Sequence, residues 1–146
     1  GPHDREMARA ALDTLGIAGL AEQEYTRISG GQRQLALVAR ALAQDAPTLV
    51  MDEPTASLDF GNQVIVLSQI ERLARTGLSI VLSTHDPDHA FACADRVAIL
   101  SGGRIAAYGS PARTVTAKRL REVYGVDVRI EKLSGGQTVC APSFST

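Results

Sequence analysis

The chain has 146 residues, of which 45% are hydrophobic and 21% are charged, and its formal net charge is −1. This length and composition suit one globular domain, and the near-zero charge gives no indication of binding to nucleic acid or to an anionic membrane surface. No apolar run approaches the roughly 18 residues of a membrane-spanning helix, and the polar first residues do not resemble a signal peptide. Cys93 and Cys140 lie far apart without a CxxC spacing, which argues against a metal site or a disulfide framework and favours a reducing cytosol.

Two helices are predicted in the first third of the chain. Apolar residues keep helical spacing over residues 4–15. After a stretch punctuated by glycines, a second helical pattern begins near residue 31 and continues to about Gln44, where Asp45-Ala46-Pro47 ends it.

The loop before the second helix carries two adjacent glycines. Ser29 is a favoured N-cap type, so the helix is predicted to begin at Gly30 or Gly31. Its first turn then offers unpaired N–H groups, and neither glycine has a Cβ atom that would keep a ligand away. Such an N-terminus favours anions, phosphate above all. On this segment alone, the alternative is a capped helix after a Gly-Gly turn, without a ligand.

A strand–helix–strand unit follows. Residues 48–51 and 78–83 form apolar runs without polar alternation, which predicts two strands buried on both faces of a parallel sheet. A helix is predicted between them over about 60–75, and crossovers of this kind join parallel strands. Another helix is predicted from Asp86-Pro87 to about Cys93.

The last third of the chain is predicted to contain two hairpins and a helix. The first hairpin pairs residues 96–100 with 104–108 across a Ser-Gly-Gly turn. A helix is predicted over 117–124. Apolar and charged residues alternate over 126–131, as in a half-buried strand, and 138–140 is its predicted hairpin partner.

Between these last two strands lies a near-copy of the first glycine loop, Leu133-Ser134-Gly135-Gly136-Gln137. A β-type run and a proline follow it, instead of an amphipathic helix. Without a helix N-terminus there is no anion site of the first kind. We therefore interpret this stretch as a plain turn.

Polar residues stand at the ends of both apolar strands. Asp52 and Glu53 follow the first strand, and ligands of open α/β sheets bind at the carboxyl ends of strands. Such a pair suits phosphoryl chemistry, in which one carboxylate holds Mg²⁺ and the next orients a nucleophile. His85 ends the second strand, and Asp59 precedes a helix. The alternatives are a turn or cap for the acidic pair, a structural role for His85, and an N-cap role for Asp59.

Together these stretches resemble the motifs of ABC-type ATPases. The corresponding segments are the signature motif at 28–34 (with Ile28 for the usual leucine), the Walker B strand and catalytic glutamate at 49–53, the D-loop at 54–59, the switch-histidine loop at 83–86 and the segment 103–109. The match spans most of 25–111. More narrowly, residues 58–63 and 120–126 resemble ATPase subunits of iron–siderophore, haem and cobalamin importers.

The resemblance implies an α/β fold: the C-terminal part of a P-loop NTPase (ABC ATPase) fold, with a mostly parallel sheet flanked by helices and a small C-terminal β-hairpin extension. The family's P-loop, G-x-x-x-x-G-K-[ST], is absent from these residues, which contain no Gly-Lys pair. The adenine-stacking aromatic residue and the Gln loop would lie upstream of residue 1. The expected division is 1–44, the end of the helical signature subdomain; 45–116, part of the ATPase core; and 117–146, a helix-and-hairpin extension.

The resemblance also implies a dimer that closes over ATP. Family members work as head-to-tail dimers, in which ATP on the P-loop of one subunit is covered by the signature loop of the other. Ser29, Gly30, Gly31 and Gln32 would contact that nucleotide, and Asp59 would lie at the dimer seam.

The other site residues would serve the subunit's own nucleotide. Asp52 would hold its Mg²⁺, and Glu53 would orient and deprotonate the attacking water. His85 would sense or stabilise the γ-phosphate.

ATP and Mg²⁺ are thus the implied cofactors. The implied partners are a second ATPase subunit, membrane-spanning permease subunits and a substrate-binding protein, without nucleic acid, and the implied place is the cytoplasm, on the inner face of the cell membrane. Two alternatives stay open: an ABC-type ATPase of DNA repair, and a truncated non-catalytic module that dimerises or binds a permease. Because the P-loop is missing, we expect no ATPase activity from the isolated chain.

Overall fold

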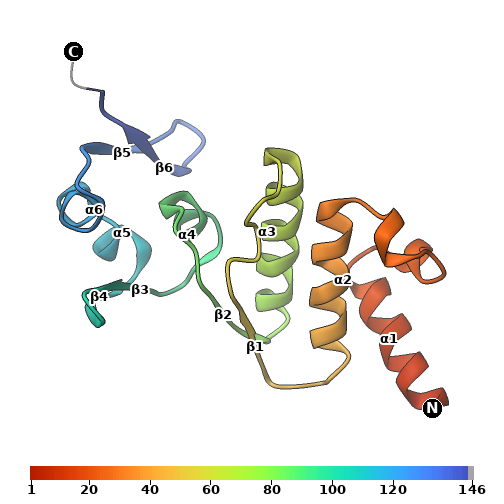
Figure 1. Cartoon of the computed structure of the whole chain (residues 1–146). Helices are drawn as coiled ribbons and strands as arrows, with labels where there is room; N and C mark the ends of the chain where they lie inside the picture. Colours follow the sequence, from red (N-terminus) through yellow and green to blue (C-terminus); the bar gives the residue numbers. More distant parts are fainter. Residues whose placement is uncertain (145–146) are drawn as a thin grey trace. The chain divides into compact units, whose positions relative to one another are not determined.

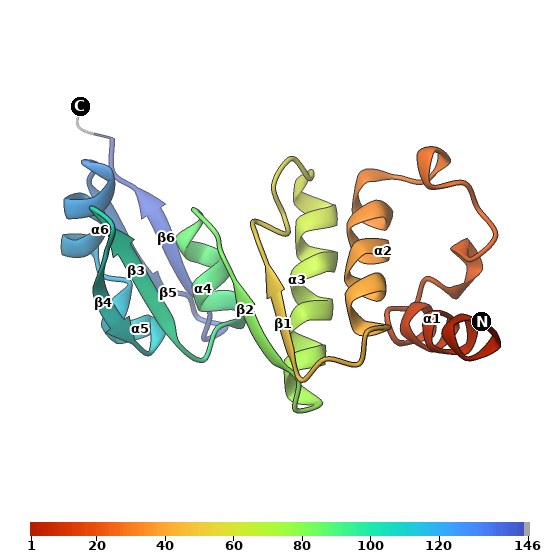
Figure 2. The same cartoon turned by 60° about the horizontal axis from the view of Figure 1, so that its bottom comes forward.

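The computed structural model describes residues 1–144, which form two compact units, residues 1–84 and 85–144 (Figures 1 and 2). The elements of the first unit are α1 (Pro2–Thr14), short 3₁₀ turns at Ala18–Leu20 and Tyr25–Arg27, α2 (Gly30–Leu42), β1 (Thr48–Met51), α3 (Phe60–Arg75) and β2 (Ser79–Leu82). The predicted helices and strands of this region are therefore confirmed, with ends that differ by a few residues.

The first unit is built around a βαβ crossover. β1 and β2 pair in parallel, with Met51 opposite Leu82, and α3 connects them. In both views α3 lies beside β1, α2 lies beside α3, and α1 lies beside α2. The core of this unit consists of Ala11, Leu15, Ile17, Leu35, Val38, Ala39, Leu49, Met51, Val66, Ile70 and Leu73.

Burial of the two strands departs from the prediction. Leu49 and Met51 are buried against the helices, but Val50 is 73% exposed and Val81 is 58% exposed. The prediction that both strands are buried on both faces is therefore wrong for the described residues. The helices cover one face of the β1–β2 pair, so side chains that alternate along each strand meet apolar neighbours on that face alone.

The second unit combines short helices with two antiparallel hairpins. Its elements are α4 (Pro87–Cys93), β3 (Val97–Ser101), β4 (Arg104–Gly109), α5 (Pro111–Thr114), α6 (Ala117–Tyr124), β5 (Val128–Lys132) and β6 (Thr138–Pro142). Ala90, Val115 and Leu120 form its buried centre, with side chains of β5 and β6 packed against it. The predicted helices and hairpins are confirmed, whereas the one-turn helix α5 was not predicted.

The fold class is α/β, as predicted. The described residues form three two-stranded sheets, of which β1–β2 is parallel and β3–β4 and β5–β6 are antiparallel. The parallel part of the expected sheet is therefore limited to one strand pair here. The three-part division at residues 44 and 116 stays a prediction.

The near-copy of the glycine loop is a turn, as predicted. It joins β5 to β6, and the Leu133 N–H donates to the Gln137 carbonyl at 2.8 Å. Gly136 has a φ of +88°, in the left-handed region that favours glycine. Cys93 and Cys140 are both thiols rather than partners in a disulfide.

Candidate functional site

The first candidate feature is the loop of residues 29–32, called the signature loop below. Ser29 is the N-cap of α2: its Oγ accepts the Gln32 N–H at 3.2 Å, and Gln32 Oε1 accepts the Ser29 N–H at 2.9 Å. This reciprocal pair is a capping box, and it confirms the predicted helix start. The N–H groups of Gly30 and Gly31, in the first turn, have no acceptor within their own helix.

The two glycines of the signature loop have different surroundings. A Cβ atom built on Gly31 would lie 2.1 Å from Asn62 Oδ1 and 2.9 Å from Asn62 Cβ, whereas one on Gly30 would lie 3.5 Å from Leu58 Cδ2. Gly31 therefore makes room for Asn62, at the start of α3. Packing against Asn62 is thus a second reason for glycine at residue 31, and the role of both glycines in leaving space for a ligand stays a prediction.

Asp59 caps α3 and fixes the same asparagine. Its Oδ1 accepts the Asn62 backbone N–H at 2.8 Å, and its Oδ2 accepts the Asn62 side-chain N–H at 2.8 Å. These hydrogen bonds, the backbone one foremost, lower the pKa of Asp59 below its usual value. The structural alternative for Asp59, an N-cap, is thus confirmed, and its place at a dimer seam stays a prediction. Asn62 links this cap to Gly31, a role that the sequence analysis did not foresee.

The acidic pair stands at the carboxyl end of β1. Asp52 and Glu53 follow Met51 and are exposed, and Glu53 has a φ of +43°, which is unusual for a residue with a side chain. Ser83 continues β2 beside them, since its N–H donates to the Met51 carbonyl at 2.9 Å. Its Oγ accepts the Glu53 N–H at 2.9 Å and donates to Asp52 Oδ1. Ser83 is a second residue that the sequence analysis did not single out.

The donors at this strand end suit magnesium better than a softer metal. Asp52, Glu53 and Ser83 offer only oxygen atoms, which are the ligands that Mg²⁺ prefers. A protein usually holds Mg²⁺ through one or two carboxylates while substrate phosphates and water complete the shell. The described residues contain no group of three or more His, Cys, Asp or Glu arranged as a metal cage. An exposed carboxylate such as Asp52 therefore fits Mg²⁺ that arrives with a nucleotide.

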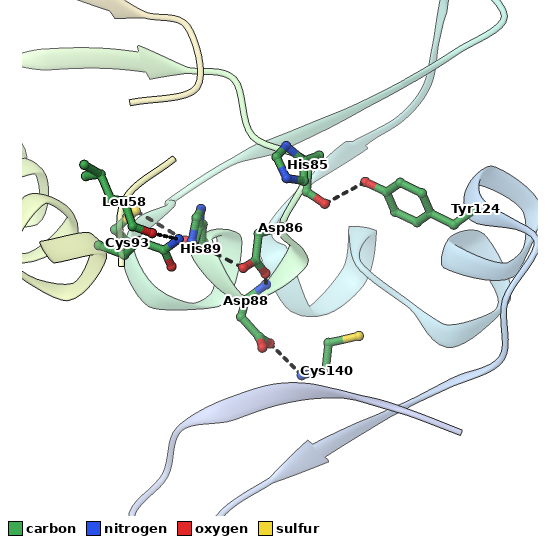
Figure 3. Close-up of polar contacts among 9 residues, drawn as sticks. Leu58, His85, Asp86, Asp88, His89, Cys93, Tyr124 and Cys140 are labelled. Atoms are coloured by element: carbon green, nitrogen blue, oxygen red, sulfur yellow. Dashed lines mark hydrogen bonds and ion pairs between the residues drawn. The ribbon is translucent and has the colours of Figure 1, made fainter. Parts of the chain in front are cut away.

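His85 opens the second unit, and neighbouring elements hold its backbone. The Tyr124 hydroxyl, from α6, donates to the His85 carbonyl at 3.0 Å, as Figure 3 shows. The next residue, Asp86, caps α4 by accepting the Asp88 N–H at 2.9 Å, and its Oδ2 lies 3.4 Å from His89 Nε2. The His85 side chain is exposed, which fits a residue that meets a ligand better than a core histidine.

The C-terminal hairpin also contacts the start of α4. Asp88 Oδ1 accepts the Cys140 N–H at 2.6 Å, so the loop that carries His85 is bordered by both α6 and β6 (Figure 3). Burial, and then the negative charges of Asp88 and Asp86, raise the pKa of the Cys140 thiol. This thiol is therefore kept protonated and is a poor nucleophile or metal ligand.

The structure thus assembles two groups within the first unit. One joins the signature loop to Asp59 through Asn62, and the other joins Asp52 to Glu53 through Ser83. His85 belongs to the second unit and is described by its own contacts.

Comparison with known proteins gives this arrangement a family. A family model described as "AAA domain, putative AbiEii toxin, Type IV TA system" matches residues 9–88, a segment that includes every candidate site residue. The Hemin import ATP-binding protein HmuV of Nocardia farcinica is 42% identical over 139 residues, which cover 94% of this chain and 48% of that protein. The chain belongs to the AAA-domain family, among the ABC transporter ATP-binding proteins.

Other ABC relatives support the fold and show the range of cargo. The Molybdate import ATP-binding protein MolC of Haemophilus influenzae is 38% identical, over 84% of this chain and 48% of that protein. A solved "inward-facing conformation of a putative metal-chelate type ABC transporter" superposes with a TM-score of 0.89 at 33% identity, over 99% of this chain and 59% of that one. The chain therefore spans about half the length of the curated ABC relatives it matches. None of the helices within residues 1–144 combines the length and apolar character that crossing a membrane requires.

Proposed function

We propose that this chain supplies the signature loop and the hydrolytic residues of an ATPase subunit that energises an ABC importer. In that longer polypeptide, the whole subunit, a P-loop half would precede these residues. The observation that carries the proposal is the pair Asp52 and Glu53 at the carboxyl end of β1, with Glu53 held in a left-handed backbone conformation. Strained residues of this kind gather at functional sites.

In this proposal the two carboxylates have separate tasks. Asp52 contributes an oxygen ligand to Mg²⁺, which would neutralise charge on the phosphates. Glu53 accepts a proton from the water that attacks the γ-phosphate, and its exposed side chain is accessible to that water. His85 adds a polar contact to the γ-phosphate.

The signature loop acts on a nucleotide held by a second subunit. Its helix N-terminus, with no Cβ atom at Gly30, favours an anion that approaches from outside. Ser29 and Gln32 hold the loop in shape through the capping box, and Asp59 lies at the dimer seam. Dimer closure would couple ATP binding to motion of permease subunits in the cell membrane, on whose inner face the subunit would lie, and a substrate-binding protein would deliver the cargo.

We further propose a metal chelate as the cargo, such as hemin, an iron–siderophore complex or cobalamin. This class is supported by the hemin importer relative, by the metal-chelate transporter structure and by the motifs at residues 58–63 and 120–126. The molybdate importer relative names a cargo outside this class. In a transporter reconstituted with its permease, hemin, an iron–siderophore, cobalamin and molybdate are compared as stimulators of ATP turnover. Stimulation by molybdate alone contradicts the metal-chelate proposal.

The decisive experiment on activity replaces Glu53 in the whole subunit. We expect Glu53→Gln to keep ATP binding while turnover falls by roughly 10² or more, the scale of a lost general base. The matched control is Glu71→Gln, the same chemical change at a half-buried position of α3 where Glu71 pairs with Arg75, and we expect it to leave turnover unchanged. Near-normal hydrolysis by Glu53→Gln contradicts the assignment.

The 146-residue chain by itself tests the non-catalytic alternative. One helix N-terminus contributes about 0.3–2 kcal/mol to anion binding, whereas a micromolar complex needs roughly 8 kcal/mol. We therefore expect isothermal titration with Mg-ATP to show no micromolar binding by this chain. A micromolar dissociation constant means that these residues contain a phosphate site of another kind.

A further inference from the structure

Ser83 is the residue at which the two parallel strands meet the acidic pair. It follows Leu82, the last residue of β2, and the register places Leu82 opposite Met51 of β1. The Ser83 N–H donates to the Met51 carbonyl at 2.9 Å, so the ladder continues one residue beyond the strands. The position of Ser83 beside Asp52 and Glu53 is therefore fixed by the backbone, whatever its side chain does.

The side chain of Ser83 then joins both carboxylate residues. Its Oγ accepts the Glu53 N–H at 2.9 Å, and its O–H donates to Asp52 Oδ1. One hydroxyl group thus fills an acceptor role toward one residue and a donor role toward its neighbour. The donated hydrogen engages one carboxylate oxygen of Asp52, and the second oxygen is not part of this contact.

The contact to Glu53 matters because of its backbone conformation. At a φ of +43°, Glu53 lies in the left-handed region, which costs a residue with a Cβ roughly 1–2 kcal/mol. A conformation of this kind persists when its surroundings hold it in place. The hydrogen bond from the Glu53 N–H to Ser83 Oγ is such a restraint, and it comes from the neighbouring strand.

We propose that Ser83 is a positioning residue for ATP hydrolysis, which holds Asp52 and Glu53 in the arrangement used for Mg²⁺ binding and water activation. This inference rests on the proposed function. Ser83 itself takes no proton from the water and forms no bond to the nucleotide. Its role is to fix the rotamer of Asp52 and the backbone of Glu53 before the nucleotide arrives, which lowers the cost of reaching the reactive geometry.

The functional test compares Ser83→Ala with Ser79→Ala in the whole subunit. Ser79 lies on the same strand, is exposed, and does not belong to the site, so its variant controls for losing a hydroxyl from β2. We expect Ser83→Ala to lower kcat about tenfold while KM for Mg-ATP changes less than about threefold, because positioning is lost rather than nucleotide contact. Ser79→Ala keeps both constants.

A second pair of variants separates the hydroxyl group from folding. Ser83→Thr and Ser83→Val have nearly the same shape and differ in one hydroxyl group. We expect Ser83→Thr to keep most of kcat and Ser83→Val to lose it about tenfold, at melting temperatures that agree within the error of the measurement. Equal kcat values in this pair overturn the inference, even if Ser83→Ala fails to fold.

A structural test uses the 146-residue chain and needs no activity. We expect hydrogen exchange at the Glu53 amide to accelerate about fivefold in Ser83→Val relative to Ser83→Thr, while amides in α3 stay unchanged. Unchanged exchange at Glu53 overturns the contact itself. Failure of the proposed function gives a different result, because the unaltered whole subunit then has no ATP turnover. In that case the positioning role of Ser83 in hydrolysis is also wrong, whereas faster exchange at the Glu53 amide still confirms the contact.

Discussion

Two stretches of this chain share the sequence Ser-Gly-Gly-Gln, and the chain folds them in different ways. Residues 29–32 open the helix α2 through a capping box, whereas residues 134–137 form the turn between β5 and β6. The two glutamines differ accordingly: the Gln32 side chain accepts a backbone N–H, and the Gln137 carbonyl closes the hairpin. The same four residues therefore open a helix N-terminus, the kind of end that favours anions, only where an amphipathic helix follows them.

The glycines differ in the reason for which they are needed. Gly31 is buried and touches Asn62, so its constraint is the space between α2 and α3. A Cβ atom added to Gly136 would meet no atom within 4 Å, but the φ of this residue is +88°. The constraint at Gly136 is therefore the backbone conformation. A glycine in a motif can thus be required by packing, by conformation or by a ligand, and only the structure distinguishes these reasons.

The largest effect is expected from Gly31→Ala. The added methyl group would overlap Asn62, whose side chain is held by Asp59, so we expect a loss of roughly 1–3 kcal/mol in the free energy of unfolding. In the whole subunit ATP turnover also falls, because the signature loop shifts. Denaturant unfolding of the 146-residue chain and an ATPase assay of the whole subunit measure the two effects.

The rescue variant for this prediction is Asn62→Ala combined with Gly31→Ala. Removing the asparagine side chain opens the space that the methyl group needs, so the double variant recovers stability relative to Gly31→Ala. Additive losses in the two variants contradict the packing explanation, because residues in contact are expected to couple.

The fold was largely predictable where the pattern is local and regular. The helix α3 matches its predicted range, because apolar residues such as Val66, Ile70 and Leu73 repeat on one face. The one-turn helix α5 was missed, since four residues carry no period. The prediction for Val50 is wrong, because an apolar run indicates that a strand can be buried on both faces. It does not indicate whether the described residues cover both faces of that strand.

The site was predictable only as far as strand ends and helix starts allow. Ser29, Asp59 and the acidic pair stand where the predicted elements place them. The roles of Asn62 and Ser83 were hidden because each depends on a contact between segments far apart in the sequence. Helical or strand periodicity is a property of one segment and carries no information about such contacts.

A smaller effect is expected from Gly136→Ala in the second stretch. A side chain at a φ of +88° strains the backbone, so we expect a loss of about 1 kcal/mol in stability, with ATP turnover of the whole subunit unchanged. Gly135→Ala is the matched control: its built Cβ meets only the end of the flexible Gln137 side chain, and its φ is not in the left-handed region. A loss of turnover in Gly136→Ala equal to that in Gly31→Ala shows that the two stretches were interpreted wrongly.

The two serines give the next test. We expect Ser29→Ala to cost about 1 kcal/mol through loss of the N-cap, whereas Ser134→Ala in the exposed turn changes stability by less than about 0.5 kcal/mol. Thermal melts of the two variants measure the difference. Equal losses contradict the capping role.

Ser29→Asp separates the cap from the proposed phosphate contact. Aspartate is as good an N-cap as serine, so the stability of the chain is expected to stay close to that of the unaltered protein. In the whole subunit, its negative charge would face the γ-phosphate, and ATP turnover should fall. Full turnover with Ser29→Asp places the nucleotide away from the signature loop.

The smallest effect concerns pH, and it should distinguish the surroundings of the two stretches. Hydrogen bonds from Asn62 lower the pKa of Asp59 in the folded chain below its ordinary value of 3.8, so the folded state favours the ionised carboxylate. The resulting stability is fully present above pH 3.8 and is lost as the pH falls through the lower pKa of the folded chain. In Asp59→Asn the side chain still caps α3 but cannot be protonated, so melting temperatures of this variant should decline less over the same acid range.

Amide signals of Gly31 and Asn62 should change with Asp59 as the pH falls. The Gly136 signal, in a turn without a carboxylate cap, should stay constant while the chain is folded. Parallel decline of both proteins, or equal changes at Gly31 and Gly136, means that Asp59 does not support the signature loop through Asn62.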